Sequence, residues 1–209
     1  MLFLPIIACT LIFNACTKKD NVPVVVNKPG EDKGWTFSET PVWADEFDTP
    51  GKPDPTKWSY ETEASGWGNN ELQFYTAGEN ANIASGILTI EARRENRERA
   101  QYTSTRMITR NFASWLYGRF EARIKVSGGR GTWPAFWMLP TDNIYGVWPR
   151  SGEIDIMEHV GYDANKIHIS VHTEAFNHMS NTHKTSITPV PTAVADFHVY
   201  RVDWTPYSI

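Results

Sequence analysis

The sequence predicts an all-β protein, and three observations support this fold class. Short segments in which apolar and polar residues alternate recur from Pro41 to the end of the chain. Glycine, proline and asparagine separate these segments, as turns between strands require. No stretch sustains an apolar period of 3.6 residues over three turns, so helices should be short and peripheral. Strands spaced in this way usually form a sandwich or a barrel.

Five segments carry the strand pattern most clearly, because each is short and alternates with a period of two residues. They are residues 87–91, 118–126, 153–157, 167–172 and 197–204. The chain stops at Ile209, directly after the last of them and without a terminal turn or cap. We therefore expect a domain that is truncated at its C-terminus.

Length and composition limit the classes of protein to consider. A chain of 209 residues with 41% hydrophobic residues is long enough for one substantial domain. The net charge is −4 and no long run of lysine and arginine occurs, so nucleic acid is not an expected partner. Nine tryptophans, eight tyrosines and ten phenylalanines suit either stacking on sugar rings or filling a β-sandwich core. Composition alone does not choose between these two uses.

The N-terminal region predicts export and a membrane anchor. Residues 1–15 are apolar, uncharged and short for a bilayer span, which is typical of a signal peptide. A buried N-terminal strand is the weaker alternative, since little in the next 20 residues could pair with it. Residues 13–16 resemble a loose bacterial lipobox, in which Cys16 would be lipidated and would hold the protein at the membrane or cell surface. Residues 16–40 lack periodicity and predict a linker, which leaves residues 41–209 as the folded domain.

Three carboxylates lie within six residues of one predicted strand. Glu153 and Asp155 are two residues apart, so they point to the same face. Glu158 breaks this parity, and a one-residue β-bulge near Met157 would bring it to their side. Crowded acids raise the pKa of at least one of them, which suits a proton donor beside a nucleophile. An acidic strand without a task is disfavoured, because alternating acids on a buried strand would be destabilising.

The run E-I-D-I-M-E at residues 153–158 resembles the active-site signature of glycoside hydrolase family 16, in its laminarinase-like branch. Residues 66–76, 117–140 and 199–209 resemble the same branch, and the match extends from about Trp43 to the end. The resemblance implies a β-jelly-roll sandwich with a concave, open cleft. It also implies a retaining endo-β-1,3-glucanase that acts on laminarin-type polysaccharide as a monomer and requires no cofactor.

The same resemblance assigns roles to the three acids. Glu153 would attack the anomeric carbon, and Glu158 would protonate the leaving oxygen and later deprotonate water. Asp155 would hold and tune the nucleophile. In retaining enzymes the two reacting carboxyl groups lie about 5–5.5 Å apart, so strand curvature and long side chains must bring these together.

Six further residues match family positions that contact substrate. Trp133, Trp137 and Trp148 would stack on sugar rings, although at least one of them could equally be a core residue. His172 would contact the substrate in the cleft. Asn69 and Arg106 would bind sugar hydroxyls on the non-reducing side. A turn role for Asn69 and a surface ion pair for Arg106 are the structural alternatives.

The sequence leaves a metal site undecided. His168 and His172 are four residues apart on one strand face, but a zinc site there with Glu158 and His159 is disfavoured, since no third ligand is fixed by the spacing. The resemblance makes a structural calcium conceivable, because many relatives hold one on the convex side and Glu46 lies in a matching segment. The corresponding C-terminal acidic ligand is not found in this sequence.

Other functions compete with β-1,3-glucan hydrolysis. A mixed-linkage β-1,3-1,4-glucanase or a galactan hydrolase would use the same acids on a different linkage, and a transglycosylase would use them on cell-wall glucan. A non-catalytic β-glucan-binding module belongs to another class and would lack the three carboxylates. Here Glu153, Asp155 and Glu158 are all present, which favours the enzyme.

Overall fold

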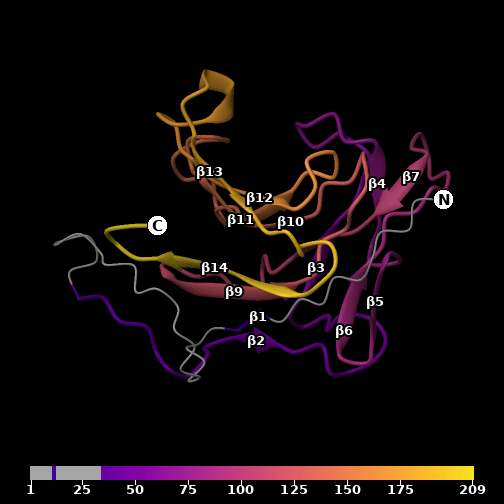
Figure 1. The fold of residues 1–209 in the computed structure, drawn as a ribbon, viewed down its shortest axis with the longest axis horizontal. Helices are drawn as coiled ribbons and strands as arrows, with labels where there is room; N and C mark the ends of the chain where they lie inside the picture. Colours follow the sequence, from indigo (N-terminus) through magenta and orange to yellow (C-terminus); the bar gives the residue numbers. More distant parts are fainter. Residues whose placement is uncertain (1–10, 13–33) are drawn as a thin grey trace.

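The computed structural model describes residues 11–12 and 34–209, and its fold is built almost entirely of strands. Two four-stranded sheets form two layers (Figure 1). One has the order β14-β9-β1-β2, with the bounds His198–Trp204, Gly118–Ile124, Leu11–Ile12 and Ala44–Asp45. The other has the order β10-β11-β12-β13, with the bounds Ala135–Met138, Glu153–His159, Lys166–His172 and Lys184–Pro189. This confirms the predicted all-β jelly-roll sandwich.

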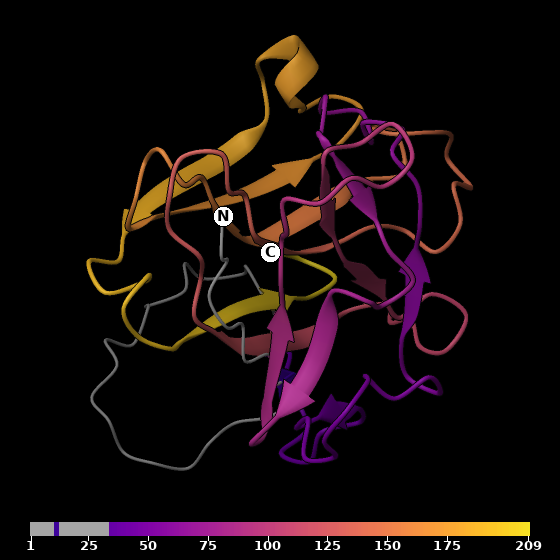
Figure 2. The same cartoon turned by 90° about the vertical axis from the view of Figure 1, so that its right-hand side faces the viewer.

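Three strand pairs lie beside the two sheets (Figures 1 and 2). They are β3 (Ser59–Glu61) with β8 (Arg106–Ile108), β4 (Gln73–Tyr75) with β7 (Tyr102–Ser104), and β5 (Ala81–Ala84) with β6 (Ile87–Ile90). Among the described residues, helix is limited to the 3₁₀ turn His178–Ser180 between β12 and β13. None of the described part therefore forms a helix that is long and apolar enough to cross a membrane.

The core lies between the two large sheets. In β9, the alternating residues Phe120, Ala122 and Ile124 are buried, because side chains of a strand point alternately to opposite faces. Ile154 and Ile156 of β11 belong to the same apolar cluster. Full burial of the phenylalanine and isoleucine side chains stabilises the fold by roughly 1.5–3 kcal/mol each. All five predicted strand segments are found, with bounds that differ by at most two residues at an end.

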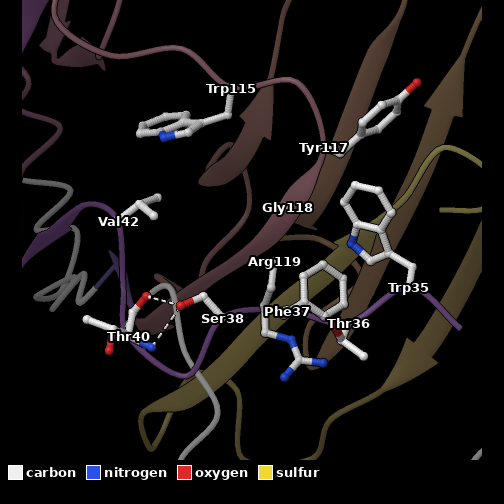
Figure 3. A pocket seen from close by; sticks show the side chains of 10 residues that line it. All are labelled: Trp35, Thr36, Phe37, Ser38, Thr40, Val42, Trp115, Tyr117, Gly118 and Arg119. Carbon is white, nitrogen blue, oxygen red and sulfur yellow. Dashed lines mark hydrogen bonds between the residues drawn. The ribbon is translucent and has the colours of Figure 1, made fainter.

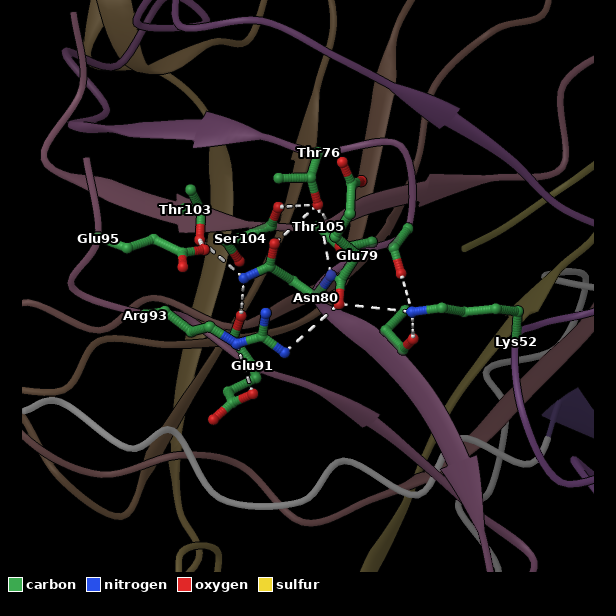
Figure 4. Close-up of polar contacts among 12 residues, drawn as sticks. Lys52, Thr76, Glu79, Asn80, Glu91, Arg93, Glu95, Thr103, Ser104 and Thr105 are labelled. Carbon is green, nitrogen blue, oxygen red and sulfur yellow. Dashed lines mark hydrogen bonds and ion pairs between the residues drawn. The ribbon is translucent and has the colours of Figure 1, made fainter. Parts of the chain in front are cut away.

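A buried polar network connects the β4–β7 and β5–β6 pairs (Figure 4). The Asn80 side chain, 1% exposed, donates to the Glu91 carbonyl and to Thr103 Oγ1, both at 2.9 Å. Thr76 Oγ1 donates to Asn80 Oδ1 at 2.7 Å. Because buried polar groups are costly unless they are paired, this network favours one arrangement of the two strand pairs.

The N-terminal segment contributes a surface groove of about 210 Å³ (Figure 3). Trp35 contacts Tyr117 edge to face at 5.9 Å, and the Arg119 guanidinium lies over the Phe37 ring at 4.8 Å. Residues 34–40 of the predicted linker thus contact the start of β9. Cys16 and most of the predicted signal peptide lie outside the described residues, so the anchor stays a prediction.

Candidate active site

A β-bulge in β11 brings the three acids to one face. Asp155 pairs with Ser170 of β12 and Glu158 pairs with His168, so one extra residue of β11 lies between the two pairs. The pairing of β11 with β10 shifts at the same place. Ile156 and Met157, within this interval, are 3% and 1% exposed and belong to the core. The bulge predicted near Met157 is therefore confirmed, and Glu158 lies on the same face as Glu153 and Asp155.

Glu153 and Asp155 form a hydrogen-bonded carboxyl pair. Burial, together with the charges of Glu153 and Glu158, raises the pKa of Asp155 to about 9. Burial also raises the pKa of Glu153, whereas hydrogen bonds from Asp155 and Trp148 oppose that rise. Asp155 therefore carries the shared proton at neutral pH and donates to the Glu153 carboxylate. This arrangement holds a charged nucleophile in a fixed orientation.

His172 completes this side of the site. It pairs directly opposite Glu153, and its Nε2 atom lies 3.2 Å from Asp155 Oδ2. Burial lowers the pKa of His172, and the nearby His178 and His183 lower it further. With His172 neutral and Asp155 protonated, Glu153 carries the negative charge of the Glu153–Asp155 pair.

Glu158 is held by an indole. Trp133 Nε1 donates to Glu158 Oε1 at 2.9 Å, while the Trp133 side chain is 61% exposed. Burial raises the pKa of Glu158, and the bond from Trp133 opposes that rise. A carboxyl group with a raised pKa and a fixed orientation suits a proton donor. The exposed ring beside it offers a flat apolar surface to a sugar.

The other two predicted tryptophans also border the acids. Trp137 of β10 pairs with Asp155 of β11 across the sheet. The Trp148 ring lies 5.8 Å from the ring of His172, and its side chain hydrogen-bonds Glu153. Neither they nor Trp133 belong to the buried core cluster, so the core alternative for these residues is not supported.

Arg106 and Asn69 are placed differently from the acids. Arg106 pairs with Glu61 across β3 and β8, and its Nε atom donates to the Glu61 carboxylate. The guanidinium lies 4.6 Å from the ring centroids of both Trp67 and Trp137. The ion-pair alternative for Arg106 therefore describes its contacts in this structure. Asn69 is exposed in a turn, where its amide donates to the Gly66 carbonyl at 2.9 Å.

Sequence reasoning missed three residues at this site. Trp67 covers the guanidinium of Arg106, and His178 and His183 lie against His172 with ring centroids 5.3 and 5.4 Å away. The two histidines come from the segment that contains the 3₁₀ turn and the start of β13. Irregular segments carry no periodicity, so their spacing gave no signal for this placement.

Metal-binding geometry occurs at the acids. Glu153, Asp155 and His172 offer one ligand atom each, and these atoms lie within 4.8 Å of one another. His168 is not part of this group, and its Nε2 atom lies 3.9 Å from Asp163 Oδ2. At the segment proposed for calcium, Asp45 already accepts hydrogen bonds from the Phe47 amide and the Trp58 indole. Calcium takes about six to eight oxygen ligands, so further oxygens besides the exposed Glu46 would be required there.

This bulged strand with its three acids defines a class of protein. The model of the family "Glycosyl hydrolases family 16" matches residues 68–209, and the chain belongs to this family. Its sequence is 55% identical to a β-glucanase of Rhodothermus marinus over 172 residues, which cover 80% of this chain and 60% of that protein. It is 42% identical to a glucan endo-1,3-β-glucosidase of Cryptopygus antarcticus over 176 residues, which cover 80% of this chain and 63% of that protein.

The fold agrees with this assignment. The structure of the laminarinase from Rhodothermus marinus superimposes with a TM-score of 0.77 at 54% sequence identity. The alignment covers 79% of this chain and 67% of that one. The chain thus spans about three fifths of the length of the curated relatives it matches.

Proposed function

We propose that this chain carries the catalytic site of a retaining endo-hydrolase of β-1,3-glucan. The observation that carries the proposal is the bulge of β11, which places Glu153, Asp155 and Glu158 on one face. The relatives named above as β-glucanase, glucan endo-1,3-β-glucosidase and laminarinase support the substrate class. The exposed ring of Trp133 beside Glu158 supports a polymer that continues beyond the cleaved bond.

In the first step, the Glu153 carboxylate attacks the anomeric carbon while Glu158 donates its proton to the leaving glycosidic oxygen. The bond from carbon to that oxygen breaks, and a covalent glycosyl ester forms on Glu153. Asp155 keeps its proton and its hydrogen bond to Glu153, so it orients the attacking oxygen without taking part in bond formation. Trp133 stabilises the Glu158 carboxylate that the proton transfer leaves.

In the second step, the Glu158 carboxylate removes a proton from water, and the water oxygen attacks the anomeric carbon. The ester bond to Glu153 breaks, and the product keeps the β-configuration because two inversions have occurred. Both steps use side chains that are present in the site, so no cofactor is needed for this chemistry.

Leaving-group dependence tests the two roles. Glu153→Ala should abolish turnover of polysaccharide and of activated aryl glycosides alike, because the nucleophile is required for both. Glu158→Ala should lose polysaccharide hydrolysis but retain glycosylation by an activated substrate. Added azide should then restore turnover and give the β-glycosyl azide. No azide rescue of Glu158→Ala, together with a β-glycosyl azide from Glu153→Ala, would show that the roles are assigned the wrong way round.

Linkage is the main alternative within the enzymes. Mixed-linkage β-1,3-1,4-glucan would use the same carboxylates, and laminarin compared with lichenan as substrate separates the two specificities. Chain lengthening among the products would instead indicate transglycosylation. A non-catalytic glucan-binding module is disfavoured, because Asp155 is buried and interacts with two other carboxylates, which is costly without a use.

Location and partners complete the proposal. The protein is exported, is lipidated at Cys16 and acts as a monomer at the membrane or cell surface. A signal-peptide-like run before Cys16 and the nature of the substrate support export, since polysaccharides of this kind are too large to enter a cell intact. A structural calcium near Glu46 stays a prediction.

A further inference from the structure

Two carboxylates and an imidazole of the site have the spacing of metal ligands. Glu153 and Asp155 lie on β11, and His172 pairs opposite Glu153 on β12. Their ligand atoms are within 4.8 Å of one another, and His172 Nε2 is 3.2 Å from Asp155 Oδ2. Atoms that bind tetrahedral zinc at about 2.0–2.2 Å lie roughly 3.3–3.6 Å apart. Binding would therefore require only small movements of these side chains.

The imidazole adds a nitrogen ligand to the two carboxylates. His172 is 6% exposed, and its Nε2 atom faces Asp155. The site is thus more than a group of acids.

The ligand types select the metal. Zinc binds imidazole nitrogen and carboxylate oxygen, commonly with three protein ligands and one water molecule. Calcium instead takes about six to eight oxygens, and magnesium usually keeps several of its waters. Two carboxylates and one imidazole in a largely buried position therefore favour zinc over both hard cations.

We infer that Zn²⁺ binds to Glu153, Asp155 and His172 and reversibly inhibits the enzyme. Binding rests on the ligand geometry, and the ion would replace the proton that Glu153 and Asp155 share. Inhibition rests on the proposed function, because the ion takes the Glu153 oxygen lone pair that would attack the anomeric carbon. Zinc should therefore inhibit competitively, so that a higher glucan concentration weakens the inhibition, because both bind at Glu153.

Calorimetric titration tests binding without reference to activity. The protein is stripped with EDTA, dialysed and titrated with ZnCl₂, and Co²⁺ serves as a spectroscopic probe, since tetrahedral Co²⁺ absorbs visible light. One saturable site is expected. His172→Gln, Asp155→Asn and Glu153→Gln should each weaken binding by at least about tenfold, because each removes a ligand. Thermal melting of each variant shows whether it is folded.

His168→Gln is the matched control. His168 lies on the same strand four residues from His172, but it is outside the three-ligand group. Binding should persist in this variant. Absence of a saturable site, zinc affinity that is unchanged in all three ligand variants, or its loss in His168→Gln alone would overturn the assignment.

Hydrolysis of laminarin is measured in parallel. Zinc should lower the rate at the concentrations that saturate the site, and EDTA should restore it. Hydrolysis without zinc binding would contradict the metal site and leave the proposed function standing. Zinc binding without any glucan hydrolysis would contradict the proposed function and leave the metal site standing.

Discussion

The hydrogen bond from Trp133 to Glu158 allows a sharp prediction. Trp133→Phe keeps a flat ring beside Glu158 and removes the donor that lies 2.9 Å from Oε1. A hydrogen bond to a charged group contributes about 1.5–3 kcal/mol. Because Trp133 is 61% exposed, water replaces part of this bond, so the lower figure applies. A loss of about 1.4 kcal/mol in transition-state stabilisation corresponds to a tenfold decrease in kcat/KM on laminarin.

The pH profile should change in a defined direction. The Trp133 bond stabilises the Glu158 carboxylate and lowers its pKa, so removing the bond raises that pKa. Glu158 must be protonated to act as the acid, and the limb where activity falls with rising pH should therefore move to higher pH. Rates on an activated aryl glycoside should change little, since protonation of a good leaving group matters less.

Trp137→Phe is the control for loss of an indole near the acids. Trp137 pairs with Asp155 and contacts Arg106, so its replacement should alter substrate affinity without moving the alkaline limb. Equal displacement of that limb in both variants, or none in Trp133→Phe, would refute the positioning role of Trp133.

Three further predictions concern different parts of the molecule. Asp155→Asn should flatten the pH dependence of stability. In the parent protein the raised pKa of Asp155 stabilises the fold at low pH, and this contribution is lost as pH rises towards about 9. Melting curves between pH 5 and 9 would detect the difference. Asn80→Ala should lower the free energy of unfolding by about 2–4 kcal/mol, because Thr76 and Thr103 lose buried partners; a change within experimental error in urea unfolding would contradict this. Cys16→Ser should release the protein from the membrane fraction without changing hydrolysis, and unchanged membrane association would count against lipidation.

The sequence was most informative where a regular strand carries the chemistry. Alternation predicted the five main strands, and the break in parity at Glu158 predicted a bulge near Met157. Both inferences depend only on the two-residue period of a strand, which local sequence determines. The placement of Asp155 beside Glu153 follows from the same period.

Contacts between distant segments could not be predicted in this way. Arg106 belongs to β8, yet its guanidinium lies between Trp67 of a turn and Trp137 of β10. His178 of the 3₁₀ turn and His183, directly before β13, both contact the ring of His172. These contacts depend on how the sheets and turns pack together, and no pattern within a single segment encodes that packing.

The bulge also explains how one strand can serve both the core and the site. In a regular strand, moving Glu158 to the face of Glu153 would place an apolar neighbour on the wrong side of the sheet. The extra residue allows both Ile156 and Met157 to stay in the core while Glu158 turns to the face of Glu153. Deletion of either residue would leave Glu158 four residues after Glu153, so a regular strand would hold both acids on one face but would lose one of the two core side chains. With Glu158 five residues after Glu153, the local irregularity of β11 is therefore a requirement of the proposed chemistry, since a regular strand of this length would place the acid and the nucleophile on opposite faces of the sheet.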